Sequence, residues 1–270
     1  MKQLLLAIQF LTIIPVTVKG VCSEEELAHS SSFFPVAGAL QGMLMALAAF
    51  ASTKIFPVEI VSSFVIFVLL LSNGGFDMDG LIDTFDGLAV KSTGDRERDL
   101  TMRLSVMKSG SIGAVGAMAL VMVVLLKFVL LNNLFRVLSL PAALSFLFII
   151  PVFSKWVTVI AMFHGRPARK DGLGSIFIGK VRPKQAALSS LILLVMCVIV
   201  AGLYLYPLYD MRTPGLFAVL FLLLYLLALI TVRFTIWRFG GLTGDHCGAL
   251  SEIAEILLMA AIPVWLQHST

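Results

Sequence analysis

The sequence predicts an all-α fold: a polytopic integral membrane bundle of about seven spans, preceded by an N-terminal interfacial or re-entrant helix. Two observations support this prediction. Of the 270 residues, 59% are hydrophobic and 13% are charged, against about 25% charged in an ordinary soluble domain. Several apolar runs also reach about 20 residues, the length that a helix needs to cross a bilayer. Runs this long and uniform favour helices over the alternating strands of a membrane barrel.

The elements follow in order along the chain. Residues 2–14 are apolar and stop before Pro15, which is typical of a short helix lying in or dipping into the membrane interface. Ser23, followed by three glutamates, predicts the start of a second helix with Ser23 as its N-cap. The seven spans are then expected near residues 33–52, 57–75, 112–131, 138–162, 186–206, 215–236 and 248–266.

The first expected span carries Gly38-x-x-x-Gly42, a small-residue pair suited to close helix packing. The same pattern is also common background in apolar helices, so the sequence leaves both interpretations open.

Lysine and arginine predict the topology. Segments 1–31, 77–111, 163–185 and 233–247 fall on one side and carry 2, 5, 6 and 2 basic residues, together 15 of the 20. By the positive-inside rule this side is cytoplasmic. The basic residues are scattered over loops without interleaved aromatic residues, which argues against a nucleic-acid partner. The lipid bilayer is an expected partner, and the sequence leaves the oligomeric state open, a homo-oligomer included.

Four aspartates, Asp77, Asp79, Asp83 and Asp86, follow the second expected span directly. On a helix the last three share one face, within about 60° of each other, and Asp77 points the other way. Like charges on one stripe repel, so the pattern favours a bound cation over a solvated acidic helix end. Acids in or beside a membrane span also tend to be functional.

The predicted cytoplasmic face combines these acids with basic residues. Asp79, Asp83 and Asp86 are candidate Mg²⁺ ligands, because Mg²⁺ prefers a few carboxylates, water and phosphate oxygens. Such a site suits phosphoryl transfer, in which metal ions neutralise developing charge. Arg103 and Lys108 follow the cluster, and Arg166 lies in a basic, turn-rich loop. These three are candidate phosphate contacts, although basic loops also serve only to set topology.

Three further acids lie near the last expected span. Asp245 precedes it, either as a helix cap or as part of the site, and Glu252 and Glu255 lie one turn apart inside it. Buried carboxylates need a partner. We expect either a basic side chain from another helix or a metal shared with the aspartates, and we count these three acids among the candidate substrate-binding residues.

Five motifs follow one another along the chain: Phe10-Leu11-Thr12-x-x-Pro15-Val16, Phe34-Pro35-x-x-Gly38-x-x-x-Gly42, Asp79-Gly80-Leu81-x-Asp83-x-x-Asp86-Gly87, Met107-Lys108-x-x-x-Ile112-Gly113 and Gly240-Gly241-Leu242-Thr243-Gly244-Asp245-x-x-Gly248-Ala249. In content and order they resemble the cobalamin synthase family, adenosylcobinamide-GDP ribazoletransferase, over nearly the whole chain.

The resemblance implies one membrane-embedded phosphotransferase domain over residues 1–270. Its substrates would be adenosylcobinamide-GDP and α-ribazole or its 5′-phosphate, with GMP as the leaving product. It implies Mg²⁺ as the cofactor, a multi-pass location in the cell membrane and an active face toward the cytoplasm. Asp79 and Asp83 would be metal ligands, and Asp86 would be either a ligand or the general base.

The chain departs from the family pattern at three places. Asp77 stands where many members have His, Ser109-Gly110-Ser111 replaces an acid-containing and arginine-containing stretch, and Ile13 stands where Arg is frequent. Two alternative functions remain: a CDP-alcohol-type phosphotransferase, whose pattern differs at Asp83-Thr84, and a cation-coupled transporter that uses the intramembrane acids.

Overall fold

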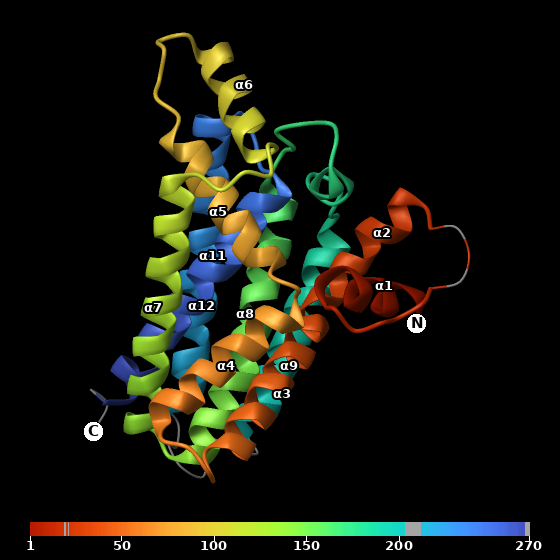
Figure 1. The fold of residues 1–270 in the computed structure, drawn as a ribbon. Helices are drawn as coiled ribbons and strands as arrows, with labels where there is room; N and C mark the ends of the chain where they lie inside the picture. Colours follow the sequence, from red (N-terminus) through yellow and green to blue (C-terminus); the bar gives the residue numbers. More distant parts are fainter. Residues whose placement is uncertain (19, 21, 203–211, 268–270) are drawn as a thin grey trace.

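The computed structural model describes residues 1–18, 20, 22–202 and 212–267, which form an all-helical bundle (Figure 1). Six of the described helices are long and apolar enough to span a membrane, and the bent pair α4 and α5 makes a possible seventh. The prediction of a polytopic helical bundle is therefore confirmed. The helices are α1 (Lys2–Leu11), α2 (Glu24–Ser30), α3 (Phe34–Ser52), α4 (Val58–Ser72), α5 (Phe76–Ala89), α6 (Arg96–Met107), α7 (Ala114–Val137), α8 (Leu140–His164), α9 (Pro183–Val200), α11 (Arg212–Phe239) and α12 (Gly244–Gln267).

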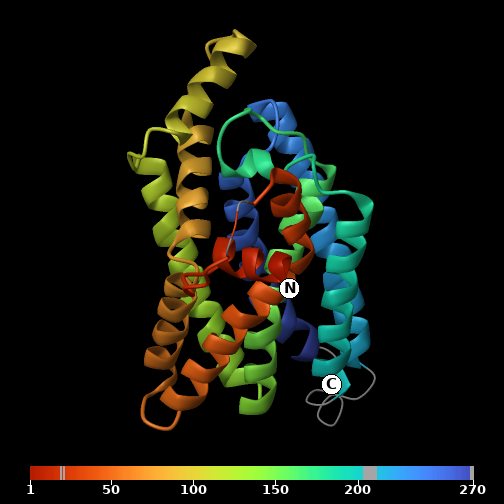
Figure 2. The same cartoon turned by 90° about the vertical axis from the view of Figure 1, so that its right-hand side faces the viewer.

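The N-terminal helix α1 has ten residues and is too short to span a bilayer. It lies across the side of the bundle, beside α2 (Figure 2). The predicted start of α2 is confirmed: the Ser23 hydroxyl accepts the Glu26 N–H, and the Glu26 side chain accepts the Ser23 N–H. This reciprocal pair is a capping box. Lys2 donates to Glu26 at 2.8 Å and so joins the two short helices.

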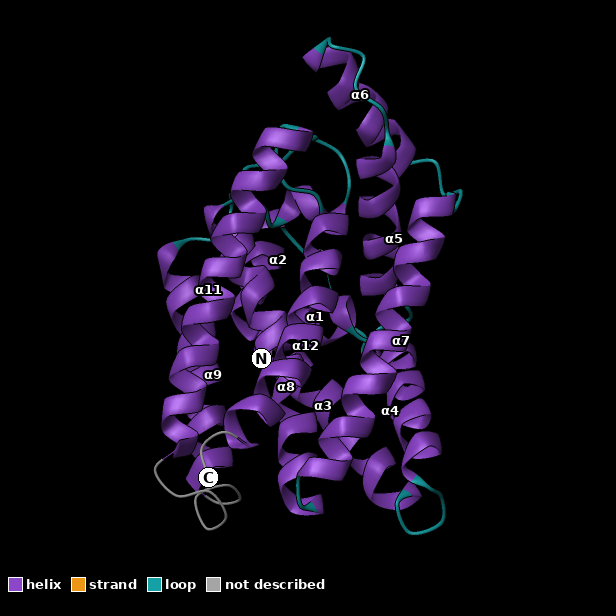
Figure 3. Ribbon diagram, turned by 90° about the vertical axis from the view of Figure 1, so that its left-hand side faces the viewer, coloured by secondary structure: helices purple, strands orange, loops and turns teal. Residues whose placement is uncertain are grey.

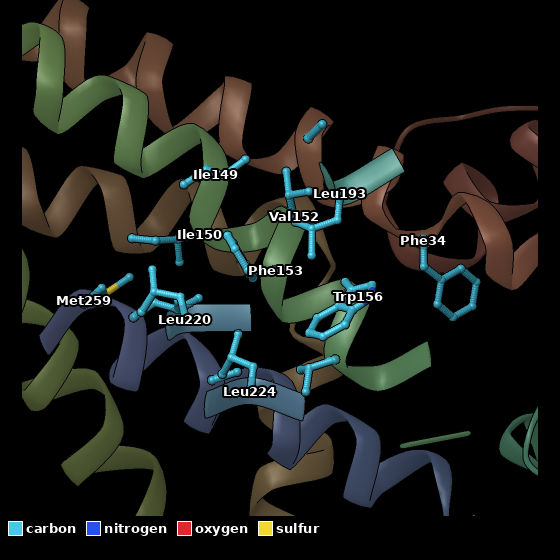
Figure 4. Packing of buried hydrophobic residues seen from close by; sticks show 14 of the residues in the cluster. Phe34, Ile149, Ile150, Val152, Phe153, Trp156, Leu193, Leu220, Leu224 and Met259 are labelled. Carbon is cyan, nitrogen blue, oxygen red and sulfur yellow. The ribbon is translucent and has the colours of Figure 1, made fainter. Parts of the chain in front are cut away.

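Helix α8 is the centre of the bundle. The apolar window of α8 is 89% buried, whereas that of α7 is 28% buried. Figure 4 shows the α8 side chains Ile150, Phe153 and Trp156 facing Leu193 of α9 and Leu220 and Leu224 of α11. A helix that is apolar on all sides suits this central position, where other helices cover nearly all of α8.

Helix α3 packs directly on α8 through Gly38 and Gly42. A Cβ built on Gly38 would lie 2.3 Å from the Pro151 carbonyl oxygen, and one on Gly42 would lie 2.1 Å from the Phe148 carbonyl oxygen. Any side chain at either position would force the two helices apart. Of the two interpretations of the Gly-x-x-x-Gly pattern, the close-packing one is correct.

The second expected span, residues 57–75, differs from the structure. Helix α4 ends at Ser72, and the chain bends by 87° before α5 continues along the bundle. Gly74 and Gly75 make this bend with φ of 64° and 77°, a left-handed conformation that glycine adopts easily. The charge pattern placed residues 77–111 on the cytoplasmic side of the spans, whereas α5 lies in the bundle with one face largely buried.

One end of the bundle gathers the segments that are rich in basic residues. The α5–α6–α7 connections, the loop from α8 to α9 and the turn from α11 to α12 all lie at this end, and α6 projects beyond it (Figures 1 and 3). The α3–α4 and α7–α8 connections lie at the opposite end. The arrangement puts the aspartates of α5 and the N-terminus of α12 in the same half of the bundle as the basic loops.

Candidate active site

Helices α5 and α12 cross in contact at two glycines. A Cβ on Gly80 of α5 would lie 2.6 Å from the Asp245 carbonyl oxygen, and one on Gly248 of α12 would lie 2.8 Å from the Asp77 carbonyl oxygen. The backbones touch because neither glycine has a side chain. The crossing sets the aspartates of α5 beside Asp245 in the first turn of α12.

Asp79, Asp83 and Asp245 form a group of neighbouring carboxylates, here called the acid cluster. Asp79 is exposed and Asp83 is half-buried. Neither makes a hydrogen bond or an ion pair with any described residue. The charges of Asp245, Asp79 and Arg169 all lie near enough to act on the Asp83 carboxylate. A cation placed among these carboxylates would relieve their repulsion.

The carboxylate of Asp86 points from α5 toward the start of α7. Its two carboxylate oxygens accept the backbone N–H groups of Gly113 at 2.7 Å and Gly116 at 2.8 Å. These groups lie at the start of α7, where helix N–H groups lack partners within the helix. Asp86 therefore caps α7 and fastens it to α5, and its assignment as metal ligand or general base stays a prediction.

Asp77 points away from the acid cluster, as the helical periodicity predicted. It is buried and forms an ion pair with Lys155 of α8. Asn73 donates to the same carboxylate at 2.9 Å, and Ser251 of α12 donates to it at 3.2 Å. This ion pair joins α5, α8 and α12 directly below the acid cluster.

Of the two partners expected for Glu252 and Glu255, the structure shows a basic side chain from another helix. Lys127 of α7 places its Nζ 2.6 Å from a carboxylate oxygen of each. The contact with Glu255 is a hydrogen bond, and Ser154 donates to the other Glu255 oxygen at 3.0 Å. The contact with Glu252 lacks hydrogen-bond geometry and is an ion pair by distance only. All three side chains are buried, and their ion pairs join α7 to α12; the assignment of Glu252 and Glu255 to substrate binding stays a prediction.

The predicted basic residues fall into different environments. Arg166 is exposed at the start of the loop between α8 and α9. Lys108 is exposed and pairs with Asp171 of that loop at 2.5 Å. The hydrogen bond from Lys108 holds the pKa of Asp171 below its usual value. The structure therefore brings the loop after α6 against the loop after α8.

Arg103 is not presented on the surface, because only 4% of its side chain is exposed. It donates to the Arg238 carbonyl oxygen at 3.0 Å and lies 3.6 Å from Asp99. Burial, and then the charge of Arg238, lower the pKa of Arg103. Hydrogen bonds from Ser92 and Thr93 lower the pKa of Asp99 to about 2. These contacts dock α6 on α11.

Arg169 is the residue of this region that the sequence did not single out. Its guanidinium lies 3.2 Å from the Asp245 carboxylate. The sequence pointed to Arg169 only through the basic, glycine-rich loop that contains it. No local pattern shows that this loop pairs with the turn before α12. A bridge between Pro167 and Leu242 makes that pairing.

The acid cluster fits a hard cation in part. Its carboxylates include two without an ionic partner, and carboxylate oxygens are suitable ligands for Mg²⁺. Within the described ranges, however, no three His, Cys, Asp or Glu side chains are gathered closely enough to form a metal-binding group by themselves. This agrees with the habit of Mg²⁺ to bind through one or two carboxylates, water and substrate phosphates.

Comparison with known proteins identifies the family. Residues 3–263 match the family described as cobalamin-5-phosphate synthase. Three similar proteins are named adenosylcobinamide-GDP ribazoletransferase. They come from Thermodesulfovibrio yellowstonii (35% identity, 99% of both chains), Geotalea daltonii (33%, 95% of this chain and 94% of the relative) and Clostridium novyi (33%, 97% and 96%). No solved structure matches the chain.

The match covers nearly the whole chain, and it includes the acid cluster, the Asp86 cap and the two loops that meet above them. The relatives bear the name of a transferase of cobalamin synthesis, which agrees with a membrane enzyme and argues against a transporter. The intramembrane acids that favoured a transporter are occupied by Lys127. This chain belongs to the cobalamin-5-phosphate synthase family.

Proposed function

We propose that this chain transfers the adenosylcobinamide phosphoryl group from adenosylcobinamide-GDP to α-ribazole, or to its 5′-phosphate, and releases GMP. The family supports the reaction, and the relatives' name supplies the two substrates. The observation that carries the proposal is the acid cluster. Asp79, Asp83 and Asp245 lie together at the end of the bundle that holds the basic loops, and two of them have no ionic partner.

In the proposed reaction a hydroxyl oxygen of ribazole bonds to the phosphorus on the cobinamide side of the diphosphate. The bond from that phosphorus to the bridging oxygen breaks, and GMP leaves with the bridging oxygen. Asp83 accepts the hydroxyl proton, since it is half-buried beside the cluster and makes no hydrogen bond with a described residue. Asp79, with Asp245, would hold Mg²⁺, which leaves Asp83 free to accept the proton. When bound, Mg²⁺ supplies positive charge that offsets the charge on the phosphoryl oxygens.

Asp86 contributes by position in this proposal. It lies one turn beyond Asp83 on α5, and its two hydrogen bonds tie that turn to the start of α7. Groups held on rigid elements keep the geometry that phosphoryl transfer needs. We propose that Asp86 fixes the orientation of Asp83.

The test is an assay of the purified protein in lipid with adenosylcobinamide-GDP, α-ribazole and Mg²⁺, in which GMP and the ribazole-containing product are both measured. The two products should appear in equal amounts. Asp79→Asn and Asp83→Asn should abolish turnover, and Glu97→Gln, an exposed acid of α6, serves as the matched control. Release of GMP without ribazole would indicate hydrolysis, and absence of both products would refute the proposed activity.

We also propose that the protein lies in the cell membrane with the acid cluster toward the cytoplasm. The support is the bias of basic residues to one end of the bundle. Single cysteines at positions 95 and 175 should react with an impermeant thiol reagent only from the cytoplasm, and a cysteine at position 55 only from outside. Reaction of positions 55 and 95 from the same side would contradict the topology.

A further inference from the structure

The guanidinium of Arg169 lies inside the acid cluster and is only partly satisfied. Its Nη2 is 3.2 Å from an Asp245 oxygen. Its Nη1 is buried and has no hydrogen-bond partner among the described residues. The charge of Arg169 also acts on Asp83. An arginine carries five N–H donors in a planar fork that matches the oxygens of a phosphate. This fork is therefore held at the cluster with donors to spare.

The backbone holds Arg169 in a defined place. The Ala168 N–H donates to the Leu242 carbonyl oxygen at 2.9 Å, and the Leu242 N–H donates to the Arg166 carbonyl oxygen at 2.8 Å. A Cβ on Gly241 would lie 2.6 Å from the Ala168 nitrogen, so the two segments touch. Arg169 thus extends from a paired segment beside the start of α12. A side chain that is placed before its ligand arrives loses less freedom on binding.

The pair with Asp245 is one that a ligand can replace. The Arg169 side chain is 23% exposed and that of Asp245 is 22% exposed. Water reaches both, and their contact is a single hydrogen bond at 3.2 Å, where the fork offers two. The pair Lys108–Asp171 is a weaker candidate for the same role, because its side chains are 66% and 60% exposed and an exposed ion pair is largely solvated.

The charges of the acid cluster explain why Arg169 pairs with Asp245 before a substrate binds. Asp79, Asp83 and Asp245 carry three negative charges against the single positive charge of Arg169, so the cluster as it stands repels a diphosphate. A divalent cation would bring this group of four residues to neutrality. Asp245 would then be attracted to the cation, and Arg169 would be free to turn its fork toward phosphate oxygens.

We infer that Arg169 contacts the diphosphate of the nucleotide-activated substrate and that Asp245 holds its guanidinium until that substrate binds. This inference rests on the proposed function. Arg169 stays protonated throughout, because a guanidinium does not lose its proton in proteins. The bond changes are those of the proposed transfer: one P–O bond forms to ribazole, one breaks to GMP, and the hydroxyl proton goes to a carboxylate. Arg169 offsets the charge that develops on the leaving GMP.

The experiment compares Arg169→Gln and Arg169→Lys with Lys170→Gln, the adjacent exposed lysine of the same loop. Each is assayed with adenosylcobinamide-GDP varied at saturating ribazole, and with ribazole varied at saturating nucleotide. Binding of adenosylcobinamide-GDP without ribazole is measured by equilibrium dialysis. Arg169→Gln should lower kcat/KM for the nucleotide by about 10²- to 10³-fold, the usual cost of losing a donor to developing charge. The KM for ribazole should stay unchanged.

The control variants distinguish loss of the contact between Arg169 and the nucleotide from loss of the folded protein. Lys170→Gln removes the same charge from the same loop and should stay within about twofold of wild type, because its side chain is solvated. Arg169→Lys keeps the charge but not the fork, so it should fold, bind the nucleotide less tightly and recover part of the loss. This variant keeps the inference testable if Arg169→Gln proves unstable.

Three outcomes overturn the inference, and one of them also refutes the proposed function. An inactive wild-type protein refutes the proposed function and the inference together. An active wild-type protein whose Arg169 variants bind and turn over the nucleotide within threefold of normal refutes the inference alone. A loss confined to the KM for ribazole does the same.

Discussion

Replacement of Lys127 by methionine should strongly destabilise the protein. Lys127 is 1% exposed, and its Nζ lies 2.6 Å from both Glu252 and Glu255. Methionine fills a similar volume but leaves two buried carboxylates without their cation. Loss of one partner of a buried ion pair costs about 3–5 kcal/mol. At about 1.4 kcal/mol per tenfold change, this lowers the ratio of folded to unfolded protein by roughly 100-fold to 4,000-fold.

The compensating variant isolates the charge effect. Lys127→Met combined with Glu252→Gln and Glu255→Gln leaves no uncompensated charge, and a buried amide costs much less free energy than a buried charge without its partner. The triple variant should therefore recover most of the loss. The measurement is reversible unfolding in mixed micelles, with retention of fold checked by circular dichroism. A loss below about 1 kcal/mol for Lys127→Met, or a triple variant less stable than the single one, would refute the electrostatic account.

Three further predictions concern other parts of the fold. Gly42→Ala should destabilise the protein by about 1–3 kcal/mol, because the added methyl overlaps the α8 backbone. Gly202→Ala is the control and should not destabilise it, because the space around Gly202 is open. Equal unfolding curves for the two variants would contradict the close contact. Asp86→Ala should lower stability by about 0.5–2 kcal/mol through loss of the α7 cap, whereas Asp83→Ala should abolish turnover without loss of stability. Thermal unfolding and GMP release are measured on both variants, and a destabilised Asp83→Ala or an Asp86→Ala as stable as wild type would contradict these roles. Hydrogen bonds lower the pKa of Asp99 to about 2. The stabilising contribution of Asp99 is therefore complete above its unfolded pKa near 4 and is lost as pH falls toward 2. Hydrogen exchange of residues 92–99, corrected for intrinsic rates, should increase as pH falls from about 4 to about 2 and stay constant above that range.

Hydropathy and helical periodicity were sufficient for the bundle and for the direction of Asp77. The spans could be predicted because bilayer thickness sets a minimum apolar length. The direction of Asp77 could be predicted because 100° per residue fixes which side chains share a face. Both are local properties, readable within a window of about 20 residues.

The partners of the charged residues could not be predicted in the same way. Asp86 meets Gly113 and Gly116, which lie 27 and 30 residues further along the chain. Lys127 meets Glu255 across 128 residues. Each partnership depends on how helices dock, which a single sequence does not encode locally. The bend at Gly74 and Gly75 was not predicted for another reason: the expected span 57–75 ran through both glycines, and the buried face of α5 is recognisable only once α7 and α12 are placed.

The two attachments of α6 have a practical consequence. This 29.3 kDa chain has most of its mass in the membrane region, so single-particle images of it offer few features for alignment. Helix α6 projects from the bundle (Figure 3), and its C-terminal half is held by Arg103 at the Arg238 carbonyl oxygen and by the ion pair of its C-cap residue Lys108 with Asp171. Its exposed tip near Asp95 is therefore a suitable place to graft a rigid helical fusion partner, one that would follow the orientation of the acid cluster without touching it.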